Sequence, residues 1–180
     1  MPRVRIAIHQ GPATAAGAAA LAVPAARAAA AGAHVLVCPE MITTGYHIGA
    51  EIPKVAEAAG GPTAAVVAGI AREHRIAIVY GYPERDGEAV FNSVQLVGGD
   101  GARLANYRKT HLFGELDRTW FTPGHQAVVQ AELHGMRIGL LLCYDVEFPE
   151  IVRAHALAGT ELLLVPTALM SPYEIVADTV

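Results

Sequence analysis

Three residues with side chains suited to covalent catalysis each follow directly on an apolar segment. Glu40 comes after HVLVCP, Lys109 after RLANYR and Cys143 after RIGLLL. A thiol can act as a nucleophile, a carboxylate can take and return its proton, and an ammonium can stabilise negative charge on a substrate oxygen. Because sites in α/β sheets form in the loops at strand ends, the three positions together indicate a candidate site that holds a thiol, a carboxylate and an ammonium.

Each residue also has an ordinary structural explanation. Cys143 could be a small buried apolar residue, Glu40 a solvated loop carboxylate, and Lys109 a surface charge whose stem lies along a strand. Position alone leaves both readings open. Cys143 has the most informative setting, because it lies between a buried strand and a helix that Pro149 opens. Such a strand-turn-helix can present a thiol and offer backbone N–H groups, such as that of Tyr144, to an oxyanion.

Composition limits the classes of protein to consider. The 180 residues predict a single domain over 1–180, without a linker or repeat. The formal net charge is -4 and the Lys and Arg residues are scattered, which argues against a nucleic-acid or anionic-membrane partner. The two cysteines, Cys38 and Cys143, form neither a disulfide framework nor a metal-ligand cluster, so we expect reduced thiols, no metal and a cytoplasmic location.

The alanine-rich stretch 13–31 needs a separate test, because it resembles a signal peptide or a membrane span. His9 to Pro12 interrupt the apolar run before it, and Pro24 and Arg27 lie within it. Alanine is also too weakly apolar to hold such a segment in lipid. We therefore expect no membrane segment here.

The hydrophobic pattern predicts strands that alternate with helices and also pair as hairpins. Expected strands cover 4–10, 34–38, 76–82, 90–97, 103–108, 127–133, 136–142 and 162–165, and expected helices cover 13–31, 62–74 and 149–158. Glycines at 98, 99 and 101 predict a tight turn between 90–97 and 103–108. The resulting fold class is α/β, with mixed sheets covered by helices.

Three segments of the chain resemble the signature segments of the nitrilase (carbon-nitrogen hydrolase) superfamily. They are VLVCPEM around Glu40, YRKTHLFGE around Lys109 and CYDVEFPE from Cys143, in the family's order, and VPTA from Val165 is also similar. The resemblance extends over nearly the whole chain. It implies a four-layer α-β-β-α sandwich, here without its last C-terminal elements, and a homo-oligomer.

The resemblance also implies a mechanism that needs no cofactor. Glu40 would act as the proton shuttle, Cys143 as the nucleophile that forms a thioester, and Lys109 with the Tyr144 N–H as the oxyanion site. Glu115 would be the second glutamate that family members place beside this group. Its alternative explanation is a surface charge paired with a neighbouring arginine.

Substrate choice follows from residues around the nucleophile. Tyr144 and Asp145 stand where we associate Trp-Glu with true nitrilases, which favours a small amide over a nitrile as substrate. Tyr46, Trp120 and Thr167 are candidate walls of the substrate pocket, although such aromatic residues are more often simply core.

Several alternatives remain open at this point. The substrate could be a carbamoyl amide or a nitrile. Cys143 could instead pair with His111 in a Cys-His hydrolase. The chain ends at Val180, before the further strands usual in the family, so an inactive truncated fragment is the non-enzyme alternative.

Overall fold

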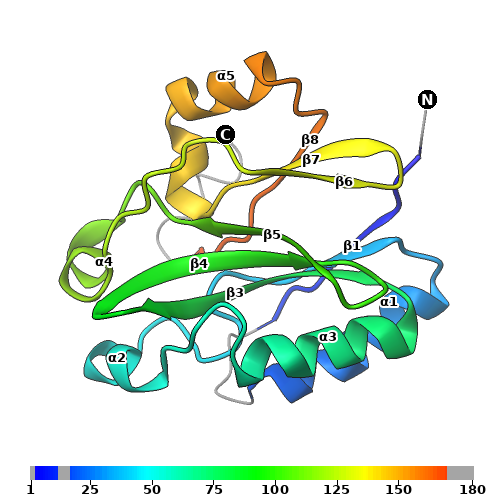
Figure 1. Cartoon of the computed structure of the whole chain (residues 1–180), viewed down its shortest axis with the longest axis horizontal. Coiled ribbons are helices and arrows are strands. Elements are labelled where there is room, and N and C mark those ends of the chain that lie inside the picture. Colours follow the sequence, from blue (N-terminus) through cyan, green and yellow to red (C-terminus); the bar gives the residue numbers. More distant parts are fainter. Residues whose placement is uncertain (1–2, 12–16, 170–180) are drawn as a thin grey trace.

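The strands of the protein form two sheets, which the computed structural model describes over residues 3–11 and 17–169 (Figure 1). Sheet A has the strand order β1-β2-β3-β4-β5, and sheet B has the order β6-β7-β8. The strands are β1 (Ile6–Ile8), β2 (Val35–Val37), β3 (Ala77–Asp86), β4 (Ala89–Val97), β5 (Arg103–Arg108), β6 (Gln130–Leu133), β7 (Met136–Leu140) and β8 (Leu162–Leu164). The helices are η1 (Ala18–Leu21), α1 (Ala22–Ala30), η2 (Gly49–Glu51), α2 (Ile52–Val55), α3 (Pro62–His74), α4 (Gly114–Trp120), η3 (Cys143–Glu147) and α5 (Pro149–Leu157).

Sheet A combines a parallel half with an antiparallel half. Strands β1, β2 and β3 are parallel, and β3, β4 and β5 are joined as successive antiparallel hairpins. The predicted hairpin of 90–97 and 103–108 is confirmed. Two reversals of direction make β5 run the same way as β2 and β3. Glu40 follows β2 and Lys109 follows β5, so both lie at the end of sheet A where these strands have their C-termini.

The layers follow the order helix, sheet, sheet, helix. One core cluster packs α1 and α3 against the outer face of sheet A, and a second fills the space between the two sheets. Helix α5 covers sheet B on the opposite side of the molecule (Figure 1). Gly139 permits this contact, because an added Cβ there would lie 2.6 Å from Nδ1 of His155 on α5. The predicted four-layer α-β-β-α sandwich is confirmed.

A third, smaller apolar cluster is formed mainly by the segments that follow β2 and β5. Its buried members include Met41, Tyr46 and Phe121, and Trp120 packs against them. This cluster encloses the region that holds Glu40 and Lys109, both almost fully buried. Among the described residues, no helix is long and apolar enough to cross a bilayer.

Candidate active site

Glu40 is held in a buried turn that packs closely against β3. The N–H of Cys38 donates to the carbonyl of Val79 at 2.9 Å, which continues the β2–β3 pairing almost to the glutamate. A Cβ at position 81 would lie 2.5 Å from the backbone nitrogen of Met41, so only glycine fits there. The Glu40 side chain is fully buried. A carboxylate buried in this way needs hydrogen-bond or charged partners.

Lys109 supplies the charged partner. Its backbone N–H donates to the carbonyl of Asn92 on β4 at 2.8 Å, which extends the β4–β5 ladder by one residue. Its Nζ lies 2.8 Å from Oε1 of Glu40 and 2.8 Å from Oδ2 of Asp117. The side chains of all three charged residues are almost fully buried. One ammonium therefore bridges two carboxylates away from solvent.

Cys143 begins η3, immediately after the buried segment that continues β7. Its backbone has φ 45°, a left-handed conformation that costs a non-glycine residue about 1–2 kcal/mol. Its N–H donates to the carbonyl of Pro166 at 3.0 Å, so the segment after β8 holds the turn. Glu40 and Lys109 are the charged groups that act on the thiol. Strand-turn-helix geometry at the cysteine is thus present as the sequence predicted.

The electrostatics keep the thiol protonated at rest and the lysine charged. Burial, together with the negative charge of Glu40, raises the pKa of the Cys143 thiol to about 12. Burial alone would lower the pKa of Lys109, but Glu40 and Asp117 outweigh it and raise that pKa above its ordinary value. At neutral pH the thiol therefore reacts only if a base takes its proton, and Glu40 is the carboxylate that acts on it.

Asp117, and not Glu115, is the second carboxylate beside this group. Glu115 is solvent-exposed on α4, so the expectation that it stands beside Lys109 is corrected. Sequence reasoning missed α4, and the 100° rotation per residue in a helix points 115 and 117 in different directions. Phe113, Leu116 and Trp120 at helical spacing were the signal that could have found it.

Tyr46 and Trp120, which were predicted as walls of the substrate pocket, both belong to the third apolar cluster. The Tyr46 hydroxyl donates to Oδ1 of Asp117 at 2.7 Å, and Lys109 Nζ lies 6.0 Å from the centroid of the Tyr46 ring. Burial and the charges of Glu40 and Asp117 raise the pKa of Tyr46, so it stays a neutral donor. Trp120 is half-buried in the same cluster.

The remaining predicted residues lie on the segments around the thiol. Tyr144 is half-buried, with its ring edge against Phe113 and Phe148. As the second residue of η3, its N–H is one of those that the helical turn itself leaves without an acceptor. The hydroxyl of Thr167 donates to the carbonyl of Val165, so this side chain is bonded to the backbone of its own segment.

His111 is engaged away from the thiol. Its Nδ1 lies 2.9 Å from Oδ1 of Asp145, and its ring stacks on Phe148 with centroids 3.9 Å apart. The Cys143 thiol interacts instead with Glu40, Lys109 and the backbone of Ala168. The geometry does not support the alternative pairing of Cys143 with His111.

Asp145 ties the cysteine turn to the segment after Lys109, a link that sequence reasoning also missed. Its fully buried carboxylate accepts hydrogen bonds from the Tyr107 hydroxyl, the Thr110 hydroxyl and the backbone N–H groups of His111 and Leu142. The distances are 2.9, 3.0, 2.8 and 3.2 Å respectively. One carboxylate therefore fixes the two loops that carry the nucleophile and the ammonium.

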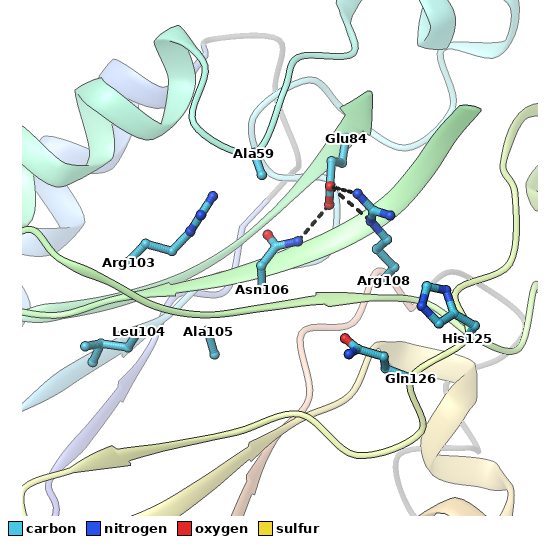
Figure 2. A pocket seen from close by; sticks show the side chains of 9 residues that line it. All are labelled: Ala59, Glu84, Arg103, Leu104, Ala105, Asn106, Arg108, His125 and Gln126. Carbon is cyan, nitrogen blue, oxygen red and sulfur yellow. Dashed lines mark hydrogen bonds and ion pairs between the residues drawn. The ribbon is translucent and has the colours of Figure 1, made fainter. Parts of the chain in front are cut away.

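A cavity of about 430 Å³ lies on the other face of the same strands (Figure 2). Glu84, Asn106 and Arg108 line it together with Arg103 and His125. Figure 2 shows Glu84 bonded to both Asn106 and Arg108, so its buried charge is already paired. Asn106 and Arg108 alternate along β5 with Ala105 and Tyr107, which belong to the core between the two sheets, so the side chains of Asn106 and Arg108 lie on the opposite face of sheet A.

Comparison with known proteins identifies the family. The model of a family described as carbon-nitrogen hydrolase matches residues 5–178. The chain belongs to the carbon-nitrogen hydrolase family. Its resemblance to that family in sequence is thereby confirmed, and the layered fold described above is the fold of the family's solved structures.

Individual carbon-nitrogen hydrolases are similar over most of this chain. A protein of Pseudomonas protegens named "Hydrolase in pqqF 5'region" is 53% identical over 152 residues, covering 83% of this chain and 53% of that protein. An (R)-stereoselective amidase of Pseudomonas sp. is 38% identical over 139 residues, covering 77% of this chain and 50% of the amidase. The chain thus spans about half the length of these curated relatives.

A solved structure gives the same result for the fold. A glutamate-to-glutamine mutant of the amidase from Nesterenkonia sp. AN1 is 33% identical, with a TM-score of 0.85, covering 98% of this chain and 69% of that chain. That structure shows covalent addition of the acetamide moiety of fluoroacetamide at the active-site cysteine of the amidase.

Proposed function

We propose that this carbon-nitrogen hydrolase cleaves a small amide to a carboxylic acid and ammonia through a thioester on Cys143. The observation that carries the proposal is the meeting of a half-buried thiol with a buried carboxylate and a buried ammonium, from three distant segments of the chain. A nucleophile whose proton a neighbouring base can take, beside a cation that can stabilise an oxyanion, is the arrangement that acyl transfer needs.

In the first half of the reaction, Glu40 takes the thiol proton and the Cys143 sulfur attacks the carbonyl carbon of the amide. The oxygen becomes negatively charged, and the Lys109 ammonium and the Tyr144 N–H stabilise it. As the C–N bond breaks, Glu40 donates its proton to the nitrogen, which leaves as ammonia. The acyl group stays on sulfur as a thioester.

In the second half, Glu40 takes a proton from water, and the oxygen of that water attacks the thioester carbonyl. The C–S bond breaks and the carboxylic acid leaves. The proton returns from Glu40 to the sulfur, which restores the resting thiol. The same carboxylate acts as base and as acid in each half, so its position beside both the thiol and Lys109 matters throughout.

The relatives support an amide as substrate, and they favour one second candidate. Amidases are among the similar proteins and solved structures. A citrullinase of Francisella tularensis and an N-carbamoylputrescine amidase of Solanum tuberosum are 30% and 32% identical. Because a carbamoyl group ends in the same C(=O)–NH₂ unit, the same attack would release ammonia from it.

Intact-mass measurement during turnover tests the proposal. The chain is mixed with simple amides, carbamoyl amides and a nitrile, and ammonia release is measured in parallel. We expect an acyl adduct that Cys143→Ala abolishes and that Cys38→Ala leaves intact, because Cys38 is a buried core thiol on the apolar outer side of sheet A. Absence of both adduct and ammonia with every compound would overturn the proposal, and the mass of an adduct would identify the acyl group.

A further inference from the structure

Asn92 on β4 makes a buried hydrogen bond to the carboxylate of Glu40. The side chain of Asn92 is fully buried, and its Nδ2 donates to Oε1 of Glu40 at 2.7 Å. The same oxygen accepts from Nζ of Lys109 at 2.8 Å. The other oxygen, Oε2, accepts from the backbone N–H of Ala168 at 3.1 Å.

The hydrogen bonds to Glu40 decide which of its two carboxylate oxygens can take up a proton. Each carboxylate oxygen has two acceptor positions. Oε1 of Glu40 fills both, with Asn92 and Lys109, whereas Oε2 fills one, with Ala168. A proton added to Oε1 would point at a donor, and a proton added to Oε2 would not.

We propose that Asn92 is a positioning residue for the hydrolase reaction proposed above, reserving Oε2 of Glu40 for the proton that Cys143 gives and takes back. Lys109 helps to fill Oε1, but it also contacts the substrate oxygen in the proposed reaction. Asn92 is the partner of Oε1 whose only task in the reaction is to orient the carboxylate.

The surroundings of Asn92 argue against a purely structural role. Its Oδ1 is buried and has no hydrogen-bond partner within the described part of the chain. Turning the amide over would aim Oδ1 at the Glu40 carboxylate, so the hydrogen bonds fix the orientation. A buried polar group that leaves one acceptor unpaired costs stability, and an apolar residue of similar volume would avoid that cost. The contact with Glu40 is what the asparagine provides.

Asn92 also joins the base to the ammonium. Its carbonyl accepts the backbone N–H of Lys109 at 2.8 Å while its side chain holds Glu40. One residue of β4 therefore sets the distance between a side chain that follows β2 and one that follows β5.

The variant Asn92→Leu tests this, because leucine has a similar volume and donates no hydrogen bond. We expect KM for the amide to change little and kcat to fall on the order of 10²-fold, the loss typical of a misplaced general base. The melting temperature should fall only modestly, because the lost hydrogen bond to the Glu40 carboxylate is partly offset by removal of the unpaired Oδ1. Ser93→Ala is the matched control: this neighbour points to the opposite face, where its hydroxyl donates to Glu84, and its kcat should stay close to wild type.

Alkylation of Cys143 by iodoacetamide gives a second measurement that needs no turnover. The groups facing Glu40 are Lys109, Cys143 and Asn92, with Asp117 and Tyr46 beyond the ammonium. Removing the Nδ2 donor leaves the carboxylate that takes the thiol proton less firmly oriented, so alkylation of Cys143 at neutral pH should be about tenfold slower in Asn92→Leu than in wild type.

The variant Asn92→Asp should also lose the fast alkylation, because a carboxylate at position 92 donates no hydrogen bond to Glu40. Unchanged kcat and an unchanged alkylation rate in Asn92→Leu would overturn the role of Asn92. A wild-type protein that is inert toward every substrate, but whose alkylation rate still depends on Asn92, would remove the proposed function and keep the positioning role.

Discussion

Two carboxylates share the single ammonium of Lys109. The sequence predicted Glu40, Lys109 and Cys143 as neighbours because each follows an apolar strand, and the coordinates bring the three together. It did not predict Asp117, because its inward direction depends on the rotation of α4, and α4 was not recognised. Reactive side chains at strand ends can thus be found from local pattern, whereas a partner on a short helix depends on that helix's phase.

Replacing Asp117 by asparagine should lower activity without unfolding the protein. The change keeps the shape of the side chain and leaves Lys109 and Glu40 as a neutral buried pair, so the fold stays supported. The ammonium would then be drawn toward Glu40 and away from a substrate oxygen, and we expect kcat/KM to fall on the order of 10²-fold.

Steady-state kinetics on the substrate identified by mass measurement would check this prediction. Glu115→Gln is the control, because Glu115 is exposed on the same helix and should stay within about twofold of wild type, as expected of a surface change. An equal loss in both variants would point to disruption of α4 rather than to the charge of Asp117.

Regular elements with strong local signals were predicted well. Pro62 begins α3, and valine-containing runs form β2 and β4; these elements and β5 all lie close to the expected bounds. The expected strand 76–82 in fact continues to Asp86 and turns at Gly87 into β4. Beyond Val79, where the pairing with β2 ends, Glu57 bridges this side of β3 through the carbonyl of Pro83 and the N–H of Arg85, so the missing N–H of Pro83 breaks no hydrogen bond of the bridge. Pairing partners, which a local pattern does not contain, decided that boundary.

The variant Asp145→Asn should loosen two segments at once, η3 and the segment after β5. An asparagine offers one acceptor oxygen in place of two, so at least one buried donor among those of Tyr107, Thr110 and Leu142 loses its partner. We expect a loss of about 3 kcal/mol in the free energy of unfolding, at the upper end for an unsatisfied buried group. Activity should fall as well, because the left-handed turn at Cys143 loses its anchor.

Urea unfolding and amide turnover of the same preparation would test this effect. Glu147→Gln is a suitable control, since Glu147 lies in η3 too but is exposed, and a small change in both measurements is expected. Full stability in Asp145→Asn would show that the hydrogen bonds to this carboxylate do not hold the turn.

For the molecule as a whole, the two sheets present their reactive segments at one place while the opposite face of sheet A carries a separate polar cluster. The four-layer arrangement followed from family resemblance, not from periodicity, because alternating elements alone fit several α/β architectures. The polar cluster around Glu84 was not anticipated, since nothing local to YPERD or RLANYR indicates that the two strands bring a carboxylate against a guanidinium. Homo-oligomerisation stays a prediction.

This cluster should make global stability depend on acidic pH. Burial alone would raise the pKa of Glu84, but hydrogen bonds from Arg108, Asn106 and Ser93 outweigh it and hold the pKa below the ordinary 4.5. The unfolded chain therefore binds a proton at Glu84 more readily than the folded protein does. The resulting stability is fully present above about pH 4.5 and is lost as the pH falls through the lower folded value.

In Glu84→Gln this dependence should be weaker. Urea unfolding of wild type at neutral pH and at about pH 3.5 should give a larger drop in free energy than the same pair of measurements on the variant, because the variant has no proton to take up at this position. Glu88→Gln, an exposed position in the same β3–β4 hairpin, should keep the wild-type drop. Equal drops in wild type and Glu84→Gln would mean that the acid sensitivity of the fold arises elsewhere in the protein.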